Sequence, residues 1–239
     1  MRVEAPPRLE LATPLLAVSP HLDDAVMSCG AVLAQHPGAV VATVFAGRPR
    51  ARTEPTEWDR ASGFGARDDV IGYRRAEDRA ALRELSAEPV WLDFRDSQYR
   101  DEHDGPRDAQ DIDEIARAIA SVVDGYGAAT VLAPLGLFHD DHRDTRRACL
   151  RAMTRRPRPS WLFYADSPYR GLPGEMDDAL DELRDRGVEP HVAARVPADH
   201  DRKERAVGCY RSQLRALDGP GRPGHEDALR AEEYWWLTH

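Results

Sequence analysis

The chain has 239 residues, 41% of them hydrophobic, and a formal net charge of −9 at pH 7. This length can bury a substantial core, and a composition with 31% charged and 7% aromatic residues is typical of a globular protein rather than a disordered one. The acidic balance argues against a nucleic-acid binder, which would carry a basic face.

The cysteines and the N-terminal segment favour a cytoplasmic protein. Cys29, Cys149 and Cys209 are an odd number without zinc-finger spacing, so no disulfide framework is expected. Residues 1–10 lack the basic-then-apolar pattern of a secretory signal. The longest apolar-rich stretch, residues 38–47, is too short to cross a bilayer, so we expect no membrane span.

Short apolar segments alternate with helical patterns along the chain. The expected strands are residues 15–19, 40–45, 90–94, 130–134, 161–165 and 191–196. The expected helices are residues 23–35, 73–85, 112–123, 143–153, 175–186 and 203–217. A long polar loop is expected at 48–72, and a Gly/Pro-rich break at 219–224.

This alternation predicts an α/β fold with a mostly parallel sheet and helices on both faces. No internal repeat, low-complexity segment or linker divides the sequence, so we expect one domain spanning residues 1–239. Ligands of such sheets bind beyond the carboxyl ends of the strands, and this rule directs attention to two polar motifs.

The first motif follows the strand at 15–19 and opens a helix. His21 offers an imidazole nitrogen to a metal, and Asp24 would lie in the first helical turn, where a carboxylate is favoured. Asp23 must then point about 100° away around the helix axis. One aspartate can therefore bind a metal while its neighbour faces a water molecule. The alternative is that both aspartates cap the helix and His21 is a loop histidine.

The second motif, His-Asp-Asp-His at residues 139–142, follows the strand at 130–134. His139 and His142 offer one metal ligand and one acid/base group, and Asp141 could orient an imidazole. The alternative is a charged surface turn. Both motifs lie at strand-to-helix transitions of one sheet, so together they could supply His, Asp and His to one cation. Nitrogen and oxygen ligands without thiolate suit zinc, with iron or manganese as other divalent metals.

These motifs resemble those of the zinc-dependent N-acetylglucosaminyl deacetylases of the PIG-L/LmbE family. The family motif Pro-His-Pro-Asp-Asp-Glu corresponds to Pro-His-Leu-Asp-Asp-Ala at residues 20–25, and His-x-Asp-His matches residues 139–142. Weaker similarities at 74–77, 91–96 and 203–213 extend the resemblance to about residues 15–217. Leu22 and Ala25 depart from the pattern. Their form resembles a bacterial subgroup that includes glycopeptide-antibiotic deacetylases, and they leave the substrate open.

The resemblance implies a Rossmann-like domain that binds no dinucleotide. It also implies that zinc is bound by His21, Asp24 and His142 and that Asp23 is the general base. The reaction would remove an N-acyl group, normally acetyl, from an amino-sugar conjugate.

The resemblance implies supporting roles for four more residues. His139 would stabilise the oxyanion or act as an acid, and Asp141 would hold it. Arg74 and Asp96 would contact the sugar.

Several aromatic residues and one lysine allow two interpretations each. Trp58 in the long loop could stack on a sugar, but anchoring of the loop is favoured. Tyr164 and Tyr169 suit packing and a pocket wall equally. Residues 234–236, Tyr-Trp-Trp, are expected in the core or in a contact between copies of a homo-oligomer. Lys203 is expected to make structural hydrogen bonds.

Three other functions remain open from the sequence. The same scaffold could cleave a thiol conjugate or a longer acyl chain, or it could bind sugar and metal without catalysis. A nucleotide-binding protein is disfavoured, because Gly30 lies alone inside a predicted helix and not in a Gly-x-Gly-x-x-Gly turn.

Overall fold

The structure is a computed structural model that describes residues 11–49, 54–100, 105–196 and 200–238. Its strands are β1 Leu15–Ser19, β2 Val40–Thr43, β3 Glu88–Trp91, β4 Thr130–Pro134, β5 Ser160–Tyr164, β6 Glu189–Val196 and β7 Glu232–Thr238. Its α-helices are α1 Asp24–Gln35, α2 Glu57–Ser62, α3 Val70–Leu85, α4 Ala109–Gly125, α5 Asp140–Arg155, α6 Glu175–Asp185, α7 His200–Val207 and α8 Arg211–Leu217. Short 3₁₀ helices are η1 Ser97–Tyr99, η3 Tyr169–Gly171 and η4 Glu226–Leu229.

The strands form one sheet in the order β3-β2-β1-β4-β5-β7-β6. Strands β1 to β5 pair in parallel, whereas β7 is antiparallel to both β5 and β6. The predicted mostly parallel α/β sheet is therefore confirmed, with an antiparallel extension at one edge.

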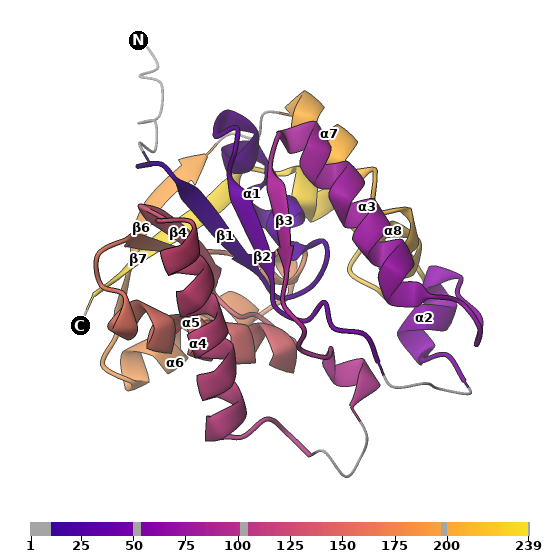
Figure 1. Cartoon of the computed structure of the whole chain (residues 1–239), viewed down its shortest axis with the longest axis horizontal. Helices are drawn as coiled ribbons and strands as arrows, with labels where there is room; N and C mark the ends of the chain where they lie inside the picture. Colours follow the sequence, from indigo (N-terminus) through magenta and orange to yellow (C-terminus); the bar gives the residue numbers. More distant parts are fainter. Residues whose placement is uncertain (1–10, 50–53, 101–104, 197–199, 239) are drawn as a thin grey trace.

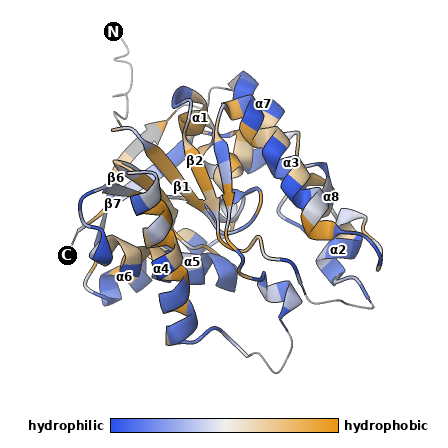
Figure 2. Cartoon of the chain, viewed as in Figure 1, coloured by the Kyte–Doolittle hydropathy of each residue, from blue (hydrophilic) through white to orange (hydrophobic). Residues whose placement is uncertain are grey.

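Helices cover both faces of this sheet (Figure 1). On β1, Leu16 and Val18 face the core beneath α4, α5 and α6, while Leu15 and Ala17 face the core beneath α1, α3, α7 and α8. This split follows from the two-residue period of a strand. Figure 2 shows the result: the central strands are hydrophobic, and the helices carry hydrophilic residues outward. Among the described residues, none of the helices combines the length and apolar character needed to cross a bilayer.

The strand order reverses between β1 and β4, which pair directly. In open α/β sheets, ligands bind at the carboxyl edge where such a reversal occurs, because the flanking loops separate there. The first polar motif follows β1 and the second follows β4, so the fold brings both to this place.

The structure corrects the sequence prediction in three segments. The predicted helix at 203–217 is two helices, α7 and α8, separated by residues 208–210. The predicted loop at 48–72 contains α2, and its last residues already belong to α3. The C-terminal strand β7 was not predicted; it buries Tyr234 and Trp235, while Trp236 remains 37% exposed.

A buried ion pair ties the C-terminal strand to the helical layer. Lys203 Nζ on α7 lies 2.8 Å from Glu232 Oε1 on β7, and both side chains are about 1% exposed. The Glu232 carboxylate also accepts hydrogen bonds from the backbone N–H groups of Ala31 and Val32. Lys203 therefore has the structural role expected from the sequence.

Gly30 leaves room for the Lys203 side chain. A Cβ at Gly30 would lie 2.8 Å from Lys203 Cγ. The ion pair with Glu232 holds the Lys203 side chain in place, so it cannot move aside. We expect Gly30→Ala to lower the free energy of unfolding by about 1–2 kcal/mol, because overpacking outweighs the better helix propensity of alanine. Urea denaturation measures this change. Gly125→Ala is the control, since a Cβ there meets nothing within 4 Å; equal stability of the two variants would contradict the packing argument.

Candidate metal centre and active site

The loop between β1 and α1 positions His21 against Asp24. Ser19 Oγ donates to the His21 carbonyl and accepts from the Ala25 N–H, which closes the loop. The Asp24 carboxylate accepts from the His21 backbone N–H at 2.8 Å and lies 3.2 Å from His21 Nδ1. Asp24 therefore faces the histidine instead of solvent.

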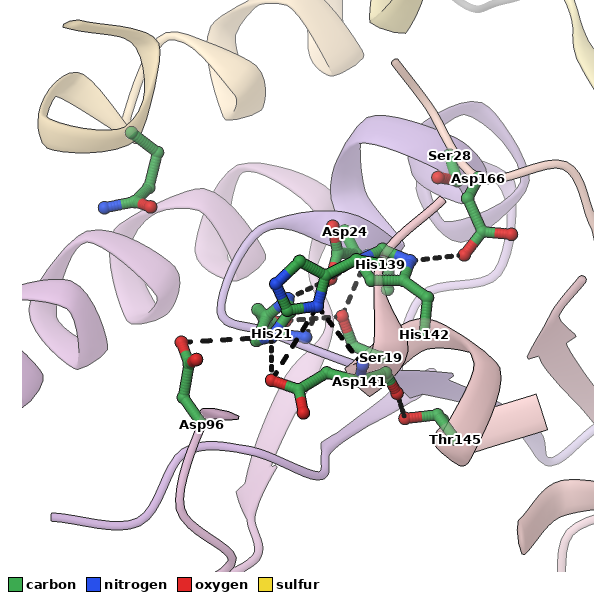
Figure 3. Close-up of polar contacts among 12 residues, drawn as sticks. Ser19, His21, Asp24, Ser28, Asp96, His139, Asp141, His142, Thr145 and Asp166 are labelled. Carbon is green, nitrogen blue, oxygen red and sulfur yellow. Dashed lines mark hydrogen bonds and ion pairs between the residues drawn. The ribbon is translucent and has the colours of Figure 1, made fainter. Parts of the chain in front are cut away.

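His142, in the first turn of α5, reaches the same carboxylate from the neighbouring strand. Its Nε2 lies 3.3 Å from Asp24 Oδ2, and its Nδ1 lies 2.6 Å from Asp166 Oδ1 (Figure 3). Asp166 follows β5 and also accepts from the Gly136 N–H. His142 is fully buried, and its Nε2 has no hydrogen-bond partner among the residues that the structure describes. A buried polar atom without a partner is costly, so this nitrogen is suited to an additional ligand.

The geometry fits one metal ion. One donor atom from each of His21, Asp24 and His142 lies within 4.8 Å of the others. The second nitrogen of each imidazole is held by a carboxylate: Asp141 lies 3.0 Å from His21 Nε2, and Asp166 holds His142. Carboxylate-supported histidines are characteristic of metal ligands, because the support fixes the ring and frees the other nitrogen.

Charges around this cluster shift the two adjacent aspartates in opposite directions. Burial alone would raise the pKa of Asp24, but His142 and His21 hold it below its ordinary value. Burial and the neighbouring Asp24 carboxylate raise the pKa of Asp23 to about 7. The Asp23 side chain lines the cavity and makes no capping hydrogen bond to α1. The helix-capping alternative is therefore wrong for Asp23.

His139 caps α5 beside the cluster. Its Nδ1 accepts from the backbone N–H of Asp141 at 3.2 Å. Nδ1 is thus an acceptor, so in the neutral ring Nε2 carries the hydrogen. Burial and the nearby His21 lower the pKa of His139, which favours this neutral form.

The Asp141 side chain holds a different histidine from the one expected. Its carboxylate lies 3.0 Å from His21 Nε2 but 3.9 Å from His139 Nδ1. It also accepts from the Ser97 N–H at 2.9 Å and from the Arg107 guanidinium. Asp141 therefore contacts His139 through its backbone and orients His21 through its carboxylate. His21, His139 and Asp141 also have metal-ligand spacing. The Asp141 carboxylate, however, is already occupied by the Ser97 N–H and the Arg107 guanidinium.

Arg74 and Asp96 lie at the edge of the cluster. Arg74 Nη1 is 3.8 Å from Asp96 Oδ2, and the same oxygen is 3.8 Å from His21 Nε2. Arg74 is only 4% exposed, and in the described part of the chain its Nε has no hydrogen-bond partner. Asp96 begins η1 and accepts from the backbone and side-chain amides of Gln98. Both residues line the same cavity as His21 and Asp23.

The cavity has a volume of about 470 Å³ and opens beside the histidine cluster. Its polar lining includes His21, Asp23, Asp24, His139, Arg74 and Asp96, and its aromatic lining includes Trp58, Phe138 and Tyr169. The Trp58 indole N–H donates to Gln213 Oε1 at 2.9 Å, so Trp58 is both anchored and part of the wall. Tyr169 is a wall residue, whereas Tyr164 is buried and donates to the Val18 carbonyl.

Sequence reasoning missed Asp166 and Arg107. Asp166 lies just beyond β5 at the carboxyl edge, and an acid at that position is the signal that could have suggested it. Arg107 precedes α4 and packs its guanidinium 4.1 Å from the Phe45 ring centroid while it contacts Asp141. Nothing in the local sequence distinguishes Arg107 from its many arginine neighbours.

The substitution Asp166→Asn tests whether Asp166 keeps the imidazole hydrogen of His142 on Nδ1 and so leaves Nε2 able to bind a metal. In Asp166→Asn, the amide oxygen would still accept from Gly136, and the amide NH₂ would then face His142 Nδ1. The imidazole hydrogen would shift to Nε2, which could no longer bind a metal in that form. We expect the metal dissociation constant to rise about 10–100-fold, measured by chelator competition. Asp113→Asn on α4 is the control, and equal affinity in both variants would contradict this role for Asp166.

The fold and site together are typical of a class of α/β metal-dependent enzyme: the site fits a metal ion, and the Asp23 carboxylate lines the same cavity. A family model described as PIG-L, GlcNAc-PI de-N-acetylase, matches residues 16–153. The chain is 33% identical over 211 residues to 2'-N-acetylparomamine deacetylase of Streptomyces fradiae, covering 83% of this chain and 72% of that protein. The chain belongs to the PIG-L family, and it is an N-deacetylase.

Solved structures agree with this assignment. The A40926 pseudoaglycone deacetylase Dbv21 is 29% identical with a TM-score of 0.74, covering 94% of this chain and 96% of that one. The zinc-inhibited form of teicoplanin deacetylase Orf2 is 28% identical with a TM-score of 0.76, covering 93% and 97%. The resemblance inferred from the motifs, including the glycopeptide-antibiotic subgroup, is confirmed.

Proposed function

We propose that this protein removes the N-acetyl group from an amino-sugar conjugate, with zinc held by His21, Asp24 and His142. The observation that carries the proposal is the buried Nε2 of His142, which lies 3.3 Å from Asp24 Oδ2 but makes no hydrogen bond within the described segments. The unbonded carboxylate of Asp23 lies on the cavity side of the same turn. When bound, zinc supplies a Lewis acid that polarises an amide carbonyl and makes water more acidic.

Asp23 is the general base in this proposal. Its carboxylate takes one proton from water as the water oxygen bonds to the carbonyl carbon. It then gives that proton to the amide nitrogen as the carbon–nitrogen bond breaks. The products are acetate and a free amine on the sugar.

His139 stabilises the negative charge that develops on the carbonyl oxygen. Because the Asp141 backbone N–H donates to Nδ1, the neutral ring offers Nε2–H to the cavity. Asp141 keeps His21 oriented through its carboxylate, and Asp166 does the same for His142. This division of roles replaces the one in which the Asp141 carboxylate holds His139.

Arg74 and Asp96 bind the sugar in this proposal. The Nε of buried Arg74 is a donor without an acceptor in the described segments, and Asp96 presents a carboxylate in the same cavity. A guanidinium next to a carboxylate can bind a sugar ring in two ways. The guanidinium donates to a sugar oxygen, and the carboxylate accepts from a sugar hydroxyl. They would fix the acetamido group against the cluster.

We also propose that the chain acts in the cytoplasm as one domain. The seven described strands form a single sheet, and the proposed site residues come from the loops and helices that connect these strands, which supports the single-domain arrangement. The proposed partner is the small-molecule substrate. If copies associate, Trp236, which is 37% exposed on β7, is one apolar residue that could take part.

Acetate release from a substrate panel tests this function. Zinc-reconstituted protein is incubated with N-acetylglucosamine, 2'-N-acetylparomamine, a long-chain N-acylglucosamine and an N-acetylated thiol conjugate of an amino sugar. We expect free amine and acetate from the N-acetylated sugars, with little product from the long acyl chain. Preference for the long chain would favour the broader amidase instead. Metal and sugar binding without any product would favour the non-catalytic module.

A further inference from the structure

We infer that Phe138 binds the part of the substrate that lies beyond the acetylated sugar, and thereby selects conjugates over free monosaccharides. This inference rests on the proposed deacetylation and names a specificity determinant for it. It is carried by the strained backbone of Phe138, the exposure of its ring, and its stacking at the wall of the active-site cavity.

The backbone at Phe138 is held in an unfavourable conformation. Its φ is +63°, a region that bulky residues rarely adopt. The His139 N–H donates to the Leu137 carbonyl at 2.7 Å, so Phe138 is the centre of a tight three-residue turn. Its own N–H donates to Glu175 Oε2 at 2.7 Å. Such strain costs on the order of 1–3 kcal/mol and is typically found at functional sites.

The strained turn presents an aromatic ring to solvent at the cavity. Phe138 is 49% exposed and lines the cavity. Its ring stacks on Tyr169, with centroids 5.0 Å apart and planes 20° apart. Tyr169 in turn meets His142 edge-on at a centroid distance of 5.2 Å. The rings therefore lead outward from the buried cluster to an exposed aromatic surface.

This order of rings indicates which part of the substrate Phe138 contacts. The acetamido group must lie beside His142 and Asp23, where the chemistry takes place. One face of Phe138 is covered by Tyr169, and about half of its surface remains exposed to take another ring. A sugar or aryl group attached to the acetylated sugar would stack there, as aromatic walls commonly hold ligand rings.

The substitution Phe138→Gly separates a loss of substrate binding from a loss of folding. Phe138→Gly removes the ring and also relieves the positive φ, so we expect Tm to stay within about 4 °C of wild type. The measurement is kcat/KM for 2'-N-acetylparomamine relative to N-acetylglucosamine. We expect this ratio to fall about tenfold, mainly through a higher KM for the conjugate, which corresponds to about 1.4 kcal/mol.

Matched variants complete the test. Phe138→Tyr keeps an aromatic ring and should retain most of the preference for the conjugate. Asparagine tolerates the same positive φ but has no ring, so Phe138→Asn should lose that preference. Ser86→Gly relieves the other positive φ of a non-glycine residue within the described segments, at the opposite edge of the sheet, and should leave the ratio unchanged.

An unchanged ratio in well-folded Phe138→Gly would overturn the inference, whether neither substrate loses activity or both lose it equally; equal losses would mean that the ring only supports His139. Wild-type protein with no preference for the conjugate would overturn it as well. Failure of the wild-type protein to release acetate from either sugar is a distinct outcome, because it would refute the proposed function itself.

Discussion

Asp23→Asn is expected to lose about 10³-fold in kcat while it keeps its metal, since a positioned general base commonly contributes 10²–10⁴-fold. Asparagine has nearly the same shape, so the turn at the start of α1 should persist. Its amide cannot take a proton from water. The Asp23 side chain makes no capping bond that the change would remove. Turnover is measured by acetate release, and bound metal by elemental analysis.

Asp140→Asn is the matched control for this variant. Asp140 belongs to the second motif, but its side chain is 85% exposed and lies outside the cavity lining. It should therefore leave turnover unchanged. Full activity in Asp23→Asn would remove Asp23 from the mechanism, and loss of metal in that variant would make it a ligand.

His142→Ala should lose both metal and activity. The change removes the imidazole that joins Asp24 to Asp166, and it leaves those two carboxylates without that partner. Because the removed group is itself a ligand, the loss of metal affinity should exceed the 10–100-fold expected for a supporting residue. Loss of the buried imidazole also removes a hydrogen-bond donor from the buried Asp166 carboxylate, which costs about 1–3 kcal/mol of stability.

A second substitution separates metal loss from unfolding. His142→Asn retains an amide near Asp166 but offers no imidazole, and it should also bind metal poorly while it stays folded by circular dichroism. His225→Ala is the control, because His225 pairs with Asp218 on the surface. Wild-type affinity and stoichiometry in a folded His142 variant would exclude it as a ligand.

The sequence predicts most of the sheet because its strands are locally encoded. Predicted strand ends differ from β1 to β6 by no more than three residues. Both site motifs could be located because each directly follows a strand, and parallel strands bring their carboxyl ends together. The place of each motif after a parallel strand therefore predicts that His21 lies near His142.

The break between α7 and α8 could not be inferred from periodicity. Apolar residues continue through it, because Val207, Tyr210 and Leu217 all pack into the same core. At the break Tyr210 makes a tertiary contact: it is fully buried and donates to Asp78 Oδ1 at 2.8 Å. The missed helix α2 had a local signal, since Thr56 and Asp59 form a capping box.

β7 and Asp166 depend on long-range partners. Glu232 at the start of β7 is fully buried, which a strand pattern does not reveal, because its partner Lys203 lies on another element. Asp166 is separated from His142 by 24 residues and belongs to neither motif. Sequence motifs identified the residues closest to the expected metal and predicted that Asp141 orients an imidazole, whereas Asp166 and the pairing of Asp141 with His21 became clear only from the structure.

A crystal structure of the zinc-loaded protein, with anomalous data collected at the zinc absorption edge, tests the central claim most directly. We expect one strong peak in contact with His21, Asp24 and His142, and Asp23 beside it without bonding to it. A peak held by His21, His139 and Asp141, or no peak within this cluster at full zinc occupancy elsewhere, would contradict the proposed centre.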